Sequence, residues 1–362
     1  MNINFRVDAS TRIGTGHVMR CLTLADALAR HGAECRFIHR AHSGHMAEVI
    51  QQRDYAVALL PAPQGCEVSA DEDKYAHWLG VTPEQDAKQT LAAFDGLRPD
   101  WLVVDHYALD TAWEGRLRSH VEHVAVIDDL ANRPHDADLL LDQNYSTEGS
   151  ARYNALLPTG TIRLCGPSYA LLHPAYCERR CAHAAHSGQV KRVLVFFGGS
   201  DADNLTGRAL EALSAPEFAA WHVDAVVGTN NPHRRELEVQ VARRRGVSLY
   251  GPQAHLADLM AAADLAIGAG GATTWERCCL GLPSLVVSIA DNQRPACEAL
   301  AADGLIAYGG NHEQVTVESL RASLAALISE PERLQRMAMA GRELVDGRGA
   351  ERVANTLMEW GD

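Results

Sequence analysis

The sequence contains no run of 18 apolar residues, and its first residues, MNINFRVDAS, form neither a basic region nor an apolar stretch. The first absence argues against a membrane-spanning helix and the second against a secretory leader. Basic residues are in the minority, since 33 Lys and Arg stand against 46 Asp and Glu, and they are scattered along the chain. We therefore expect a cytoplasmic protein that neither inserts into a membrane nor binds nucleic acid.

Apolar residues are numerous enough for two domains. Hydrophobic residues make up 47% of 362 positions, and single cores rarely grow beyond about 250–300 residues. Short, continuously apolar runs alternate with helical patterns, which predicts parallel sheets covered on both faces. The alternation stops between Tyr153 and Gln189, a segment with three prolines and a polar run, and restarts at Arg192.

The expected fold is α/β, with two Rossmann-like, doubly wound lobes that face a central cleft. The first lobe is predicted to span residues 1–175 and the second residues 176–345, while a terminal helix at 346–362 packs back on the first lobe. The expected strands are Ile3–Val7, Cys35–Ile38, Ala56–Leu60, Trp101–Asp105, Val124–Ile127 and Leu139–Leu141, followed by Arg192–Phe197, His222–Val227, Val247–Leu249, Asp264–Ile267, Ser284–Ser288 and Leu305–Tyr308.

The stretch Arg12–Arg20 joins the first strand to the first helix and contains Gly14, Gly16 and His17. The glycines allow a sharp bend and a close approach of the backbone to a ligand. The helix that begins near His17 points unpaired N–H groups and the positive end of its dipole into the same space. His17 is therefore a candidate general base, and the alternative is an ordinary helix start with a surface histidine.

The stretch Ile267–Arg277 predicts a phosphate site. Three glycines follow an apolar strand, and Ala272, Thr273 and Thr274 form the first turn of a helix, so backbone amides and hydroxyls converge at a helix N-terminus. No lysine follows the glycines as in a P-loop. Glu276, one turn into the helix, is placed to accept hydrogen bonds from both ribose hydroxyls; the alternative is a tight loop with an exposed glutamate.

Metal-binding patterns are weak. Asp-x-Asp triplets occur at 71–73, 136–138 and 201–203, and in many sugar-nucleotide transferases such a pair binds a metal that neutralises pyrophosphate. Only the third triplet follows a predicted strand, and there helix capping is the simpler interpretation. The Cys177, Cys181, His183 and His186 set lacks the long spacer between ligand pairs of familiar zinc fingers. We expect no metal and no cofactor.

A series of motifs occurs in a fixed order along most of the chain: Arg6-x-Asp8, Gly14-Thr15-Gly16-His17-x-x-Arg20-Cys21, Asp105-His106-Tyr107, Asp128-Asp129, Gly166-Pro167-x-Tyr169-Ala170-Leu171, Gly198-Gly199-Ser200-Asp201, Gly268–Pro283 and Asn292-Gln293. In this combination the chain resembles the UDP-sugar hydrolases of pseudaminic acid biosynthesis, often called PseG. That family is similar in fold to GT-B glycosyltransferases. The resemblance implies metal-independent hydrolysis of UDP-2,4-diacetamido-2,4,6-trideoxy-β-L-altropyranose between the anomeric carbon and the phosphate oxygen, with UDP as product.

The resemblance also implies roles for the matching residues. His17 would orient and deprotonate the attacking water, Tyr107 and Asn292 would position sugar and water, and Glu276 would hold the ribose. The phosphates would lie on amides of Gly271, Ala272, Thr273 and Thr274, with uracil near Leu256. Arg12, Gly14, Gly16 and Gln293 complete the predicted substrate-binding set.

Two points stay open at the level of sequence. Asp8, one strand end from His17, either orients the imidazole or is a buried hydrogen-bonding residue. The function alternatives are a GT-B glycosyltransferase, which shares the nucleotide lobe but needs an acceptor, and a non-catalytic nucleotide-sugar binding protein. A transferase commonly carries an apolar or basic membrane-facing patch on the first lobe, where this sequence shows only the separated Arg36, Arg40 and Arg53.

Overall fold

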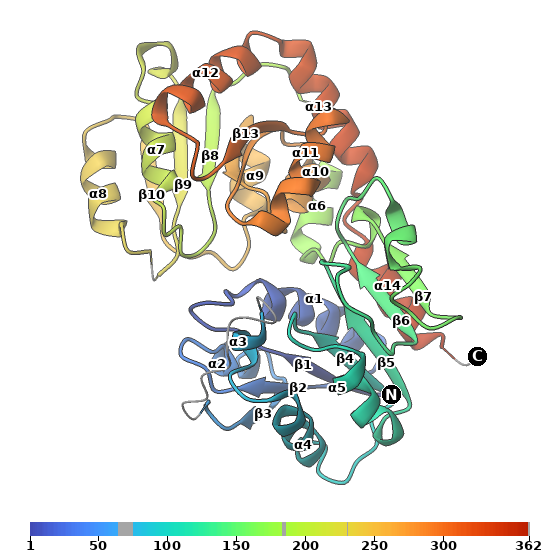
Figure 1. Cartoon of the computed structure of the whole chain (residues 1–362). Coiled ribbons are helices and arrows are strands. Elements are labelled where there is room, and N and C mark those ends of the chain that lie inside the picture. The colour runs from blue at the N-terminus through green and yellow to red at the C-terminus, as the bar shows by residue number, and fades with distance from the viewer. Residues whose placement is uncertain (64–74, 183–185, 230, 361–362) are drawn as a thin grey trace. The chain divides into compact units, whose positions relative to one another are not determined.

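The computed structural model describes residues 1–63, 75–182, 186–229 and 231–360 (Figure 1). The chain forms two compact units. Unit 1 consists of Met1–Asn144, Glu148–Leu171 and Gly349–Asp362, and unit 2 of Tyr145–Thr147 and Leu172–Arg348. Each unit has its own parallel sheet with helices packed on it, so the predicted fold class of two doubly wound α/β lobes is confirmed.

The sheet of unit 1 has seven strands in the order β3-β2-β1-β4-β5-β6-β7. They are β1 (Asn2–Val7), β2 (Glu34–Arg40), β3 (Ala56–Leu60), β4 (Trp101–Asp105), β5 (His123–Ile127), β6 (Leu139–Asp142) and β7 (Ile162–Cys165). All pairs are parallel, and Phe5 of β1 lies between Phe37 of β2 and Val103 of β4. The strand order reverses between β1 and β4, the place where such sheets bind ligands.

The helices of unit 1 are α1 (Gly16–Arg30), α2 (Ala47–Gln51), α3 (Ala76–Leu79), α4 (Pro83–Ala93), α5 (Thr111–Leu117) and α14 (Gly349–Met358). Thr82 is the N-cap of α4, since its side chain accepts a hydrogen bond from the backbone N–H of Gln85 and Pro83 occupies the first turn.

The C-terminal helix α14 packs on α1, and its buried residues join the core on that face of the sheet. The indole of Trp101 donates to the carbonyl of Leu357 at 3.2 Å. At the start of α14, a Cβ on Gly349 would lie 2.3 Å from the carbonyl oxygen of Ala170. Only glycine permits this approach, so the last helix of the chain is fixed within the unit that contains the first strand.

Unit 2 has a six-stranded parallel sheet in the order β10-β9-β8-β11-β12-β13. Its strands are β8 (Arg192–Phe196), β9 (His222–Val226), β10 (Val247–Tyr250), β11 (Leu265–Ala269), β12 (Ser284–Ser288) and β13 (Ala307–Asn311). Its helices are α6 (Pro174–Ala182), α7 (Leu205–Ala212), α8 (Arg234–Ala242), α9 (Ala257–Ala262), α10 (Thr273–Leu280), α11 (Arg294–Ala302), α12 (Val317–Ile328) and α13 (Pro331–Leu344). Among the described residues of both units, 3₁₀ turns lie at Arg118–His120, Gly149–Tyr153, Pro167–Tyr169, Pro216–Phe218 and Asp291–Gln293.

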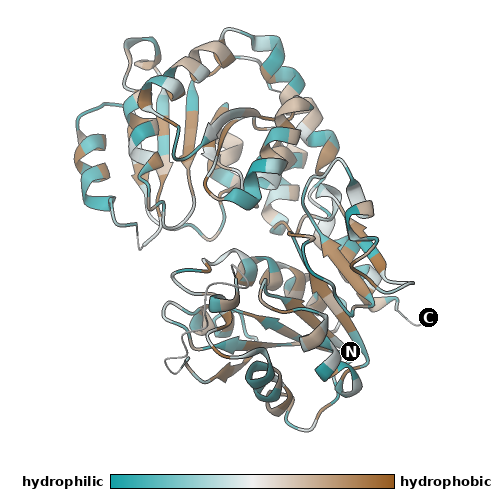
Figure 2. Cartoon of the chain, in the orientation of Figure 1, coloured by the Kyte–Doolittle hydropathy of each residue, from teal (hydrophilic) through white to brown (hydrophobic). Residues whose placement is uncertain are grey.

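Hydropathy follows the layers of each unit. Strands β5 and β6 are largely hydrophobic in colour, whereas the outer helix α8 is largely hydrophilic (Figure 2), and Leu237 is its buried residue. No helix within the described ranges is long and apolar enough to span a membrane.

Two strands, β7 and β13, differ most from the prediction. β7 has no counterpart in it, because four residues with an exposed Ile162 lie between prolines in a segment that we interpreted as a domain boundary. β13 begins two residues later than expected and runs through Gly309 and Gly310, where the pairing with β12 shifts register. Glycine-rich edge strands of this kind carry little hydrophobic signal.

Candidate functional site

The candidate site of unit 1 lies at the carboxyl ends of β1, β4 and β5. The loop after β1 turns at Gly14, whose φ of +81° is the left-handed conformation that favours glycine. Helix α1 then begins at Gly16, and His17 is its second residue. No side chain of the described residues caps this helix, so the N–H groups of its first turn lack a side-chain acceptor.

A buried carboxylate holds the ring of His17. Nδ1 of His17 lies 2.6 Å from Oδ1 of Asp105, the last residue of β4. Two acceptors at this distance would repel each other, so the proton is assigned to Nδ1, which donates to the carboxylate. The lone pair is then on Nε2, which is the ring atom able to accept a proton from water.

Arg20 completes the charge balance of this carboxylate. It lies one turn after His17, and it donates from Nε to Oδ2 of Asp105 and from Nη2 to Oδ1, both at 2.6 Å. Burial disfavours the charge on Asp105, but Arg20 and His17 outweigh burial and hold the pKa of Asp105 well below its usual range. The orienting carboxylate therefore stays ionised.

Tyr107 lies against His17, with ring centroids 4.7 Å apart and the rings nearly perpendicular. Its hydroxyl donates to Oδ2 of Asp129 at 2.8 Å. Burial, and then Asp129, raise the pKa of Tyr107 well above its ordinary value. Tyr107 is thus a neutral phenol whose oxygen can still accept a hydrogen bond. Trp78 of α3 stacks on it at 5.3 Å.

Asp8 takes the second of its two predicted roles. It is fully buried, lies 2.8 Å from Nη1 of Arg6 and accepts the backbone N–H of Arg40 at 2.7 Å. Asp105 occupies the position on Nδ1 of His17 that the first role requires. The interpretation that Asp8 orients His17 is therefore wrong, because Asp8 pairs with Arg6 of the preceding strand, β1, and with the end of β2.

Arg12 is exposed, and its backbone N–H donates to the hydroxyl of Ser10 at 3.1 Å. Together with Ser10, His42 and Trp78 it lines a cavity of about 430 Å³ beside the loop after β1. Gly16 has open space at its Cβ position, since no described atom lies within 4 Å.

The candidate site of unit 2 lies where β11 runs into α10. A Cβ on Gly270 would lie 2.3 Å from Sγ of Cys297, and one on Gly268 would lie 2.5 Å from the carbonyl oxygen of Phe196. Glycine is therefore required at both positions by close packing. The helix that follows has no side-chain cap among the described residues. The N–H groups of Thr274 and Trp275 donate to the carbonyls of Gly271 and Ala272, so the amides open to an anion are the preceding ones, from Gly271 to Thr273.

Arg277 ties this loop to the helix. From one buried guanidinium it donates to the carbonyl of Ala269 at 2.8 Å and to the hydroxyls of Thr274 at 3.0 Å and Thr273 at 3.2 Å. These contacts fix the glycine loop and both threonines as one piece.

Glu276 lies one turn into α10. Its Oε2 is buried and has no hydrogen-bond partner within the part of the chain that the structure describes. Burial raises the pKa of Glu276 to about 7, although a hydrogen bond with Tyr176 opposes the shift. Leu256 is buried, and its backbone N–H donates to the hydroxyl of Tyr176 at 3.1 Å. Tyr176 thus joins the region predicted for uracil to Glu276.

Of the Asn292-Gln293 pair, Gln293 lies beside the glycine loop. Its Oε1 accepts the backbone N–H of Ile289 at 3.0 Å, and its Nε2 lies 3.6 Å from the Cβ position of Gly271. Asn292 is exposed on the 3₁₀ turn Asp291–Gln293, and Ala272 is exposed at the start of α10.

Aspartates of two Asp-x-Asp triplets hold parts of the fold. Both carboxylate oxygens of Asp201 accept N–H groups at the start of α7, from Leu205 at 2.8 Å and Thr206 at 2.9 Å, so Asp201 is a helix cap. Asp138 accepts hydrogen bonds from Arg118 and the backbone of Val124. The triplet at 71–73 and His183 lie outside the described residues.

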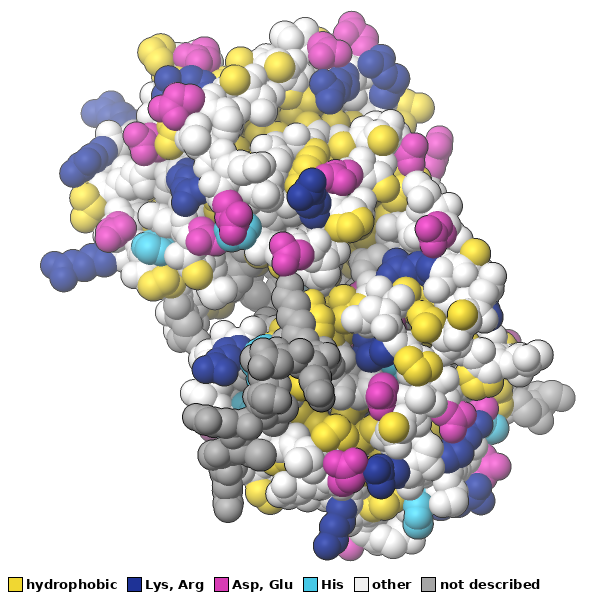
Figure 3. All heavy atoms as spheres, in the orientation of Figure 1, with side chains coloured by type: hydrophobic (Ala, Val, Ile, Leu, Met, Phe, Trp, Pro, Cys, Tyr) yellow, Lys and Arg dark blue, Asp and Glu magenta, His cyan; other side chains and the backbone are white. Residues whose placement is uncertain are grey.

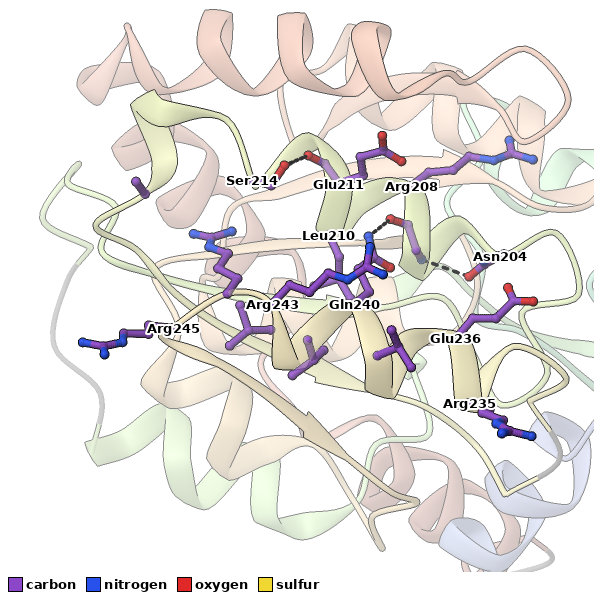
Figure 4. A pocket seen from close by; sticks show the side chains of 16 residues that line it. Asn204, Arg208, Leu210, Glu211, Ser214, Arg235, Glu236, Gln240, Arg243 and Arg245 are labelled. Atoms are coloured by element: carbon purple, nitrogen blue, oxygen red, sulfur yellow. Dashed lines mark hydrogen bonds between the residues drawn. The ribbon is translucent and has the colours of Figure 1, made fainter.

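A cavity of about 1080 Å³ in unit 2 contains none of the predicted site residues. It lies between α7 and α8, where Gln240 donates to the carbonyl of Gly207 (Figure 4). Acidic and basic side chains are interspersed on the face that Figure 3 shows.

Sequence reasoning missed four residues of the first site: Asp105, Arg20, Asp129 and Trp78. The first three stand in the quoted motifs, and their signal is their position at strand ends or one helical turn from His17. No motif marks Trp78, which reaches Tyr107 from the segment after β3.

Known proteins show similarity over the whole chain. Residues 192–353 match the glycosyltransferase family 28 C-terminal domain. MurG of Acinetobacter baumannii has a similar structure, with a TM-score of 0.67 at 16% identity over 99% of both chains, and the fold of this chain is thus of the GT-B type. The UDP-2,4-diacetamido-2,4,6-trideoxy-beta-L-altropyranose hydrolase of Campylobacter jejuni is 23% identical over 72% of this chain and 81% of its own length.

The similarity is stronger to the spore coat polysaccharide biosynthesis protein SpsG of Bacillus subtilis, which is 31% identical over 99% of this chain and 98% of its own length. The chain therefore belongs to the family of SpsG.

Proposed function

We propose that the chain is a metal-independent hydrolase that cleaves a UDP-linked 2,4-diacetamido-2,4,6-trideoxy sugar of the β-L-altrose type at the anomeric C–O bond. The observation that carries the proposal is the 2.6 Å contact between Nδ1 of His17 and buried Asp105. It leaves Nε2 as a proton acceptor in a fixed direction, which is what a general base for water requires. The Campylobacter jejuni relative supplies the substrate class.

The reaction forms a bond between the oxygen of water and the anomeric carbon and breaks the bond between that carbon and the phosphate oxygen. The proton of water passes to Nε2 of His17, and UDP leaves with the bonding electron pair. Because UDP is a stable anion, its departure needs charge neutralisation more than protonation. The amides of Gly271, Ala272 and Thr273, at the uncapped start of α10, suit this task, and Glu276 is the acceptor for the ribose hydroxyls.

Tyr107 and Asn292 position water and sugar in this proposal. The phenol of Tyr107 is neutral and already donates to Asp129, so its oxygen presents an acceptor rather than a base. Asn292 contributes an exposed amide. Neither residue takes a proton in the proposed reaction.

Oxygen-18 water tests the bond that is cleaved. Purified protein is incubated with the UDP-sugar, EDTA and no acceptor, and UDP and sugar are analysed by mass spectrometry. We expect the label in the free sugar and none in UDP. Label in UDP would show attack on phosphorus, and absence of UDP release would overturn the hydrolase. His17→Ala should abolish release while leaving UDP binding intact.

A glycosyltransferase is the second candidate, and the match to the family 28 C-terminal domain favours it. The same assay separates the two functions. A transferase releases UDP at a substantial rate only when an acceptor is added, and the sugar is then recovered on the acceptor, whereas the hydrolase needs water alone.

A further inference from the structure

We propose that Arg20 is a positioning residue that holds the side chains of His17 and Tyr107 in one arrangement through Asp105 and Asp129. The inference rests on the proposed function for its kinetic consequences, since it assigns His17 and Tyr107 to the reaction. The contacts themselves are properties of unit 1.

The two carboxylates each accept from two directions. Oδ1 of Asp105 receives Nη2 of Arg20 at 2.6 Å and faces Nδ1 of His17 at 2.6 Å. Oδ2 of Asp129 receives Nη1 of Arg20 at 2.7 Å and the hydroxyl of Tyr107 at 2.8 Å. One guanidinium is therefore hydrogen-bonded to both of the carboxylates that contact the rings of His17 and Tyr107.

The geometry of the guanidinium makes the coupling rigid. Its five N–H donors lie in one plane at fixed angles. Arg20 grips Asp105 with Nε and Nη2 and reaches Asp129 with Nη1, so neither carboxylate can rotate without losing a hydrogen bond. The side chain of Arg20 is only 9% exposed, and that of Asp105 is fully buried, so water does not compete freely for these contacts.

Position on the helix explains why an arginine stands here. Arg20 is three residues after His17 on α1, which places both side chains on the same face. The thiol of Cys21, the next residue, also points to Oδ2 of Asp105 at 3.4 Å. The motif Gly16-His17-x-x-Arg20-Cys21 therefore supplies the base and the clamp on its carboxylate from a single turn of helix.

A lysine cannot replace this clamp. Its ammonium is a single point charge, and it cannot span the three carboxylate oxygens that Arg20 contacts. We expect Arg20→Lys to lower kcat for UDP release about 100-fold with little change in KM, because a misplacement of about 1 Å at a reacting group has an effect of this size. The matched control is Arg118→Lys, which makes the same change at an arginine that grips Asp138 elsewhere in unit 1.

A double-mutant cycle tests the contacts from Asp129 to Tyr107 without changing Arg20. If Asp129 acts through Tyr107, Asp129→Asn lowers kcat about 10-fold in the wild-type background and has little effect in Tyr107→Phe. Equal effects of Asp129→Asn in both backgrounds, or Arg20→Lys with kcat within twofold of wild type, would overturn the proposal. The cycle remains informative if Arg20→Lys does not fold.

Nuclear magnetic resonance of the His17 ring separates this proposal from the proposed function. In wild type without substrate, we expect one ring tautomer with a slowly exchanging proton on Nδ1, assigned by its absence in His17→Ala. In Arg20→Lys, that proton should exchange faster, whereas Arg118→Lys should leave it unchanged. A wild type that releases no UDP but shows this difference would reject the hydrolase and retain the clamp; an unchanged ring in Arg20→Lys would reject the clamp.

Discussion

The two candidate sites lie at equivalent edges of their sheets but are built from different groups. In unit 1, ionised side chains are packed against one another, and each of Asp105, Arg20 and Asp129 holds at least two partners. In unit 2, the backbone of the glycine loop forms much of the site, and its glycines are packed where no Cβ fits. Unit 1 should therefore be sensitive to changes of charge at constant size, and unit 2 to changes of size at constant charge.

The largest effect is expected for Asp105→Asn, which removes a charge and almost no volume. An amide cannot hold both Nδ1–H of His17 and the fork of Arg20, so we expect kcat for UDP release to fall about 10²–10⁴-fold, as in histidines that lose an orienting carboxylate. UDP affinity, measured by calorimetry, should stay within about threefold. Asp138→Asn is the control, and a similar loss there would show a general effect of carboxylate removal.

Gly270→Ala is the matching test in unit 2, since it adds one methyl group and no charge. That methyl group meets Sγ of Cys297, and overpacking of this kind costs about 1–3 kcal/mol. Chemical denaturation should show the loss, and Gly270→Ala with Cys297→Ala should recover most of it. Gly271→Ala, whose nearest described atom is 3.6 Å away, should be close to wild type in stability. A stable Gly270→Ala would contradict the packing argument.

Asp142, at the end of β6 in unit 1, makes the stability of the protein depend on pH. Burial, followed by Asp129, raises the pKa of Asp142 from 3.8 to about 7. Between these values the folded protein keeps a proton that the unfolded chain has lost, so this group's stabilisation is complete below pH 3.8 and declines by about 1.4 kcal/mol per pH unit as pH rises to 7.

Asp142→Asn mimics the protonated form, and the variant should gain free energy of unfolding relative to wild type as pH rises through this window. The pKa of Asp138 is lowered instead. The free energy of unfolding of Asp138→Asn should therefore fall relative to wild type as pH rises. Parallel pH profiles for wild type and Asp142→Asn would contradict the prediction.

The smallest effects are expected for alanine substitutions at the two glycines before His17. Alanine at Gly14 must adopt a φ of +81°, which costs about 1–2 kcal/mol, whereas alanine at Gly16 meets open space and should change stability by less than about 0.5 kcal/mol. Thermal unfolding measures both. Should Gly16→Ala fold normally yet lose activity, the substrate approaches the backbone there; if it keeps full activity, Gly16 is not a substrate contact.

The sequence predicts the strands and the positions of the two loops better than it predicts which side chains contact one another. Apolar runs and strand ends place the turn at His17 and the loop at Gly271 on the correct edges of two parallel sheets. The choice of Asp105 over Asp8 as the partner of His17 depends on which way each carboxylate turns at its strand end, and that is decided by Arg6 and Arg20 in the packed structure. Trp78 is set by tertiary contacts alone.

The position of α14 has a consequence for synthesis of the chain. Ala350, Val353, Ala354 and Leu357 belong to the same core as Ile3 and Phe5, so β1 cannot complete its core until α14 has left the ribosome. Unit 2 consists of Tyr145–Thr147 and Leu172–Arg348, so all of its residues are synthesised before α14. Unit 1 is thus completed after unit 2, and a chain truncated before Gly349 leaves the apolar face of α1 without the packing of α14.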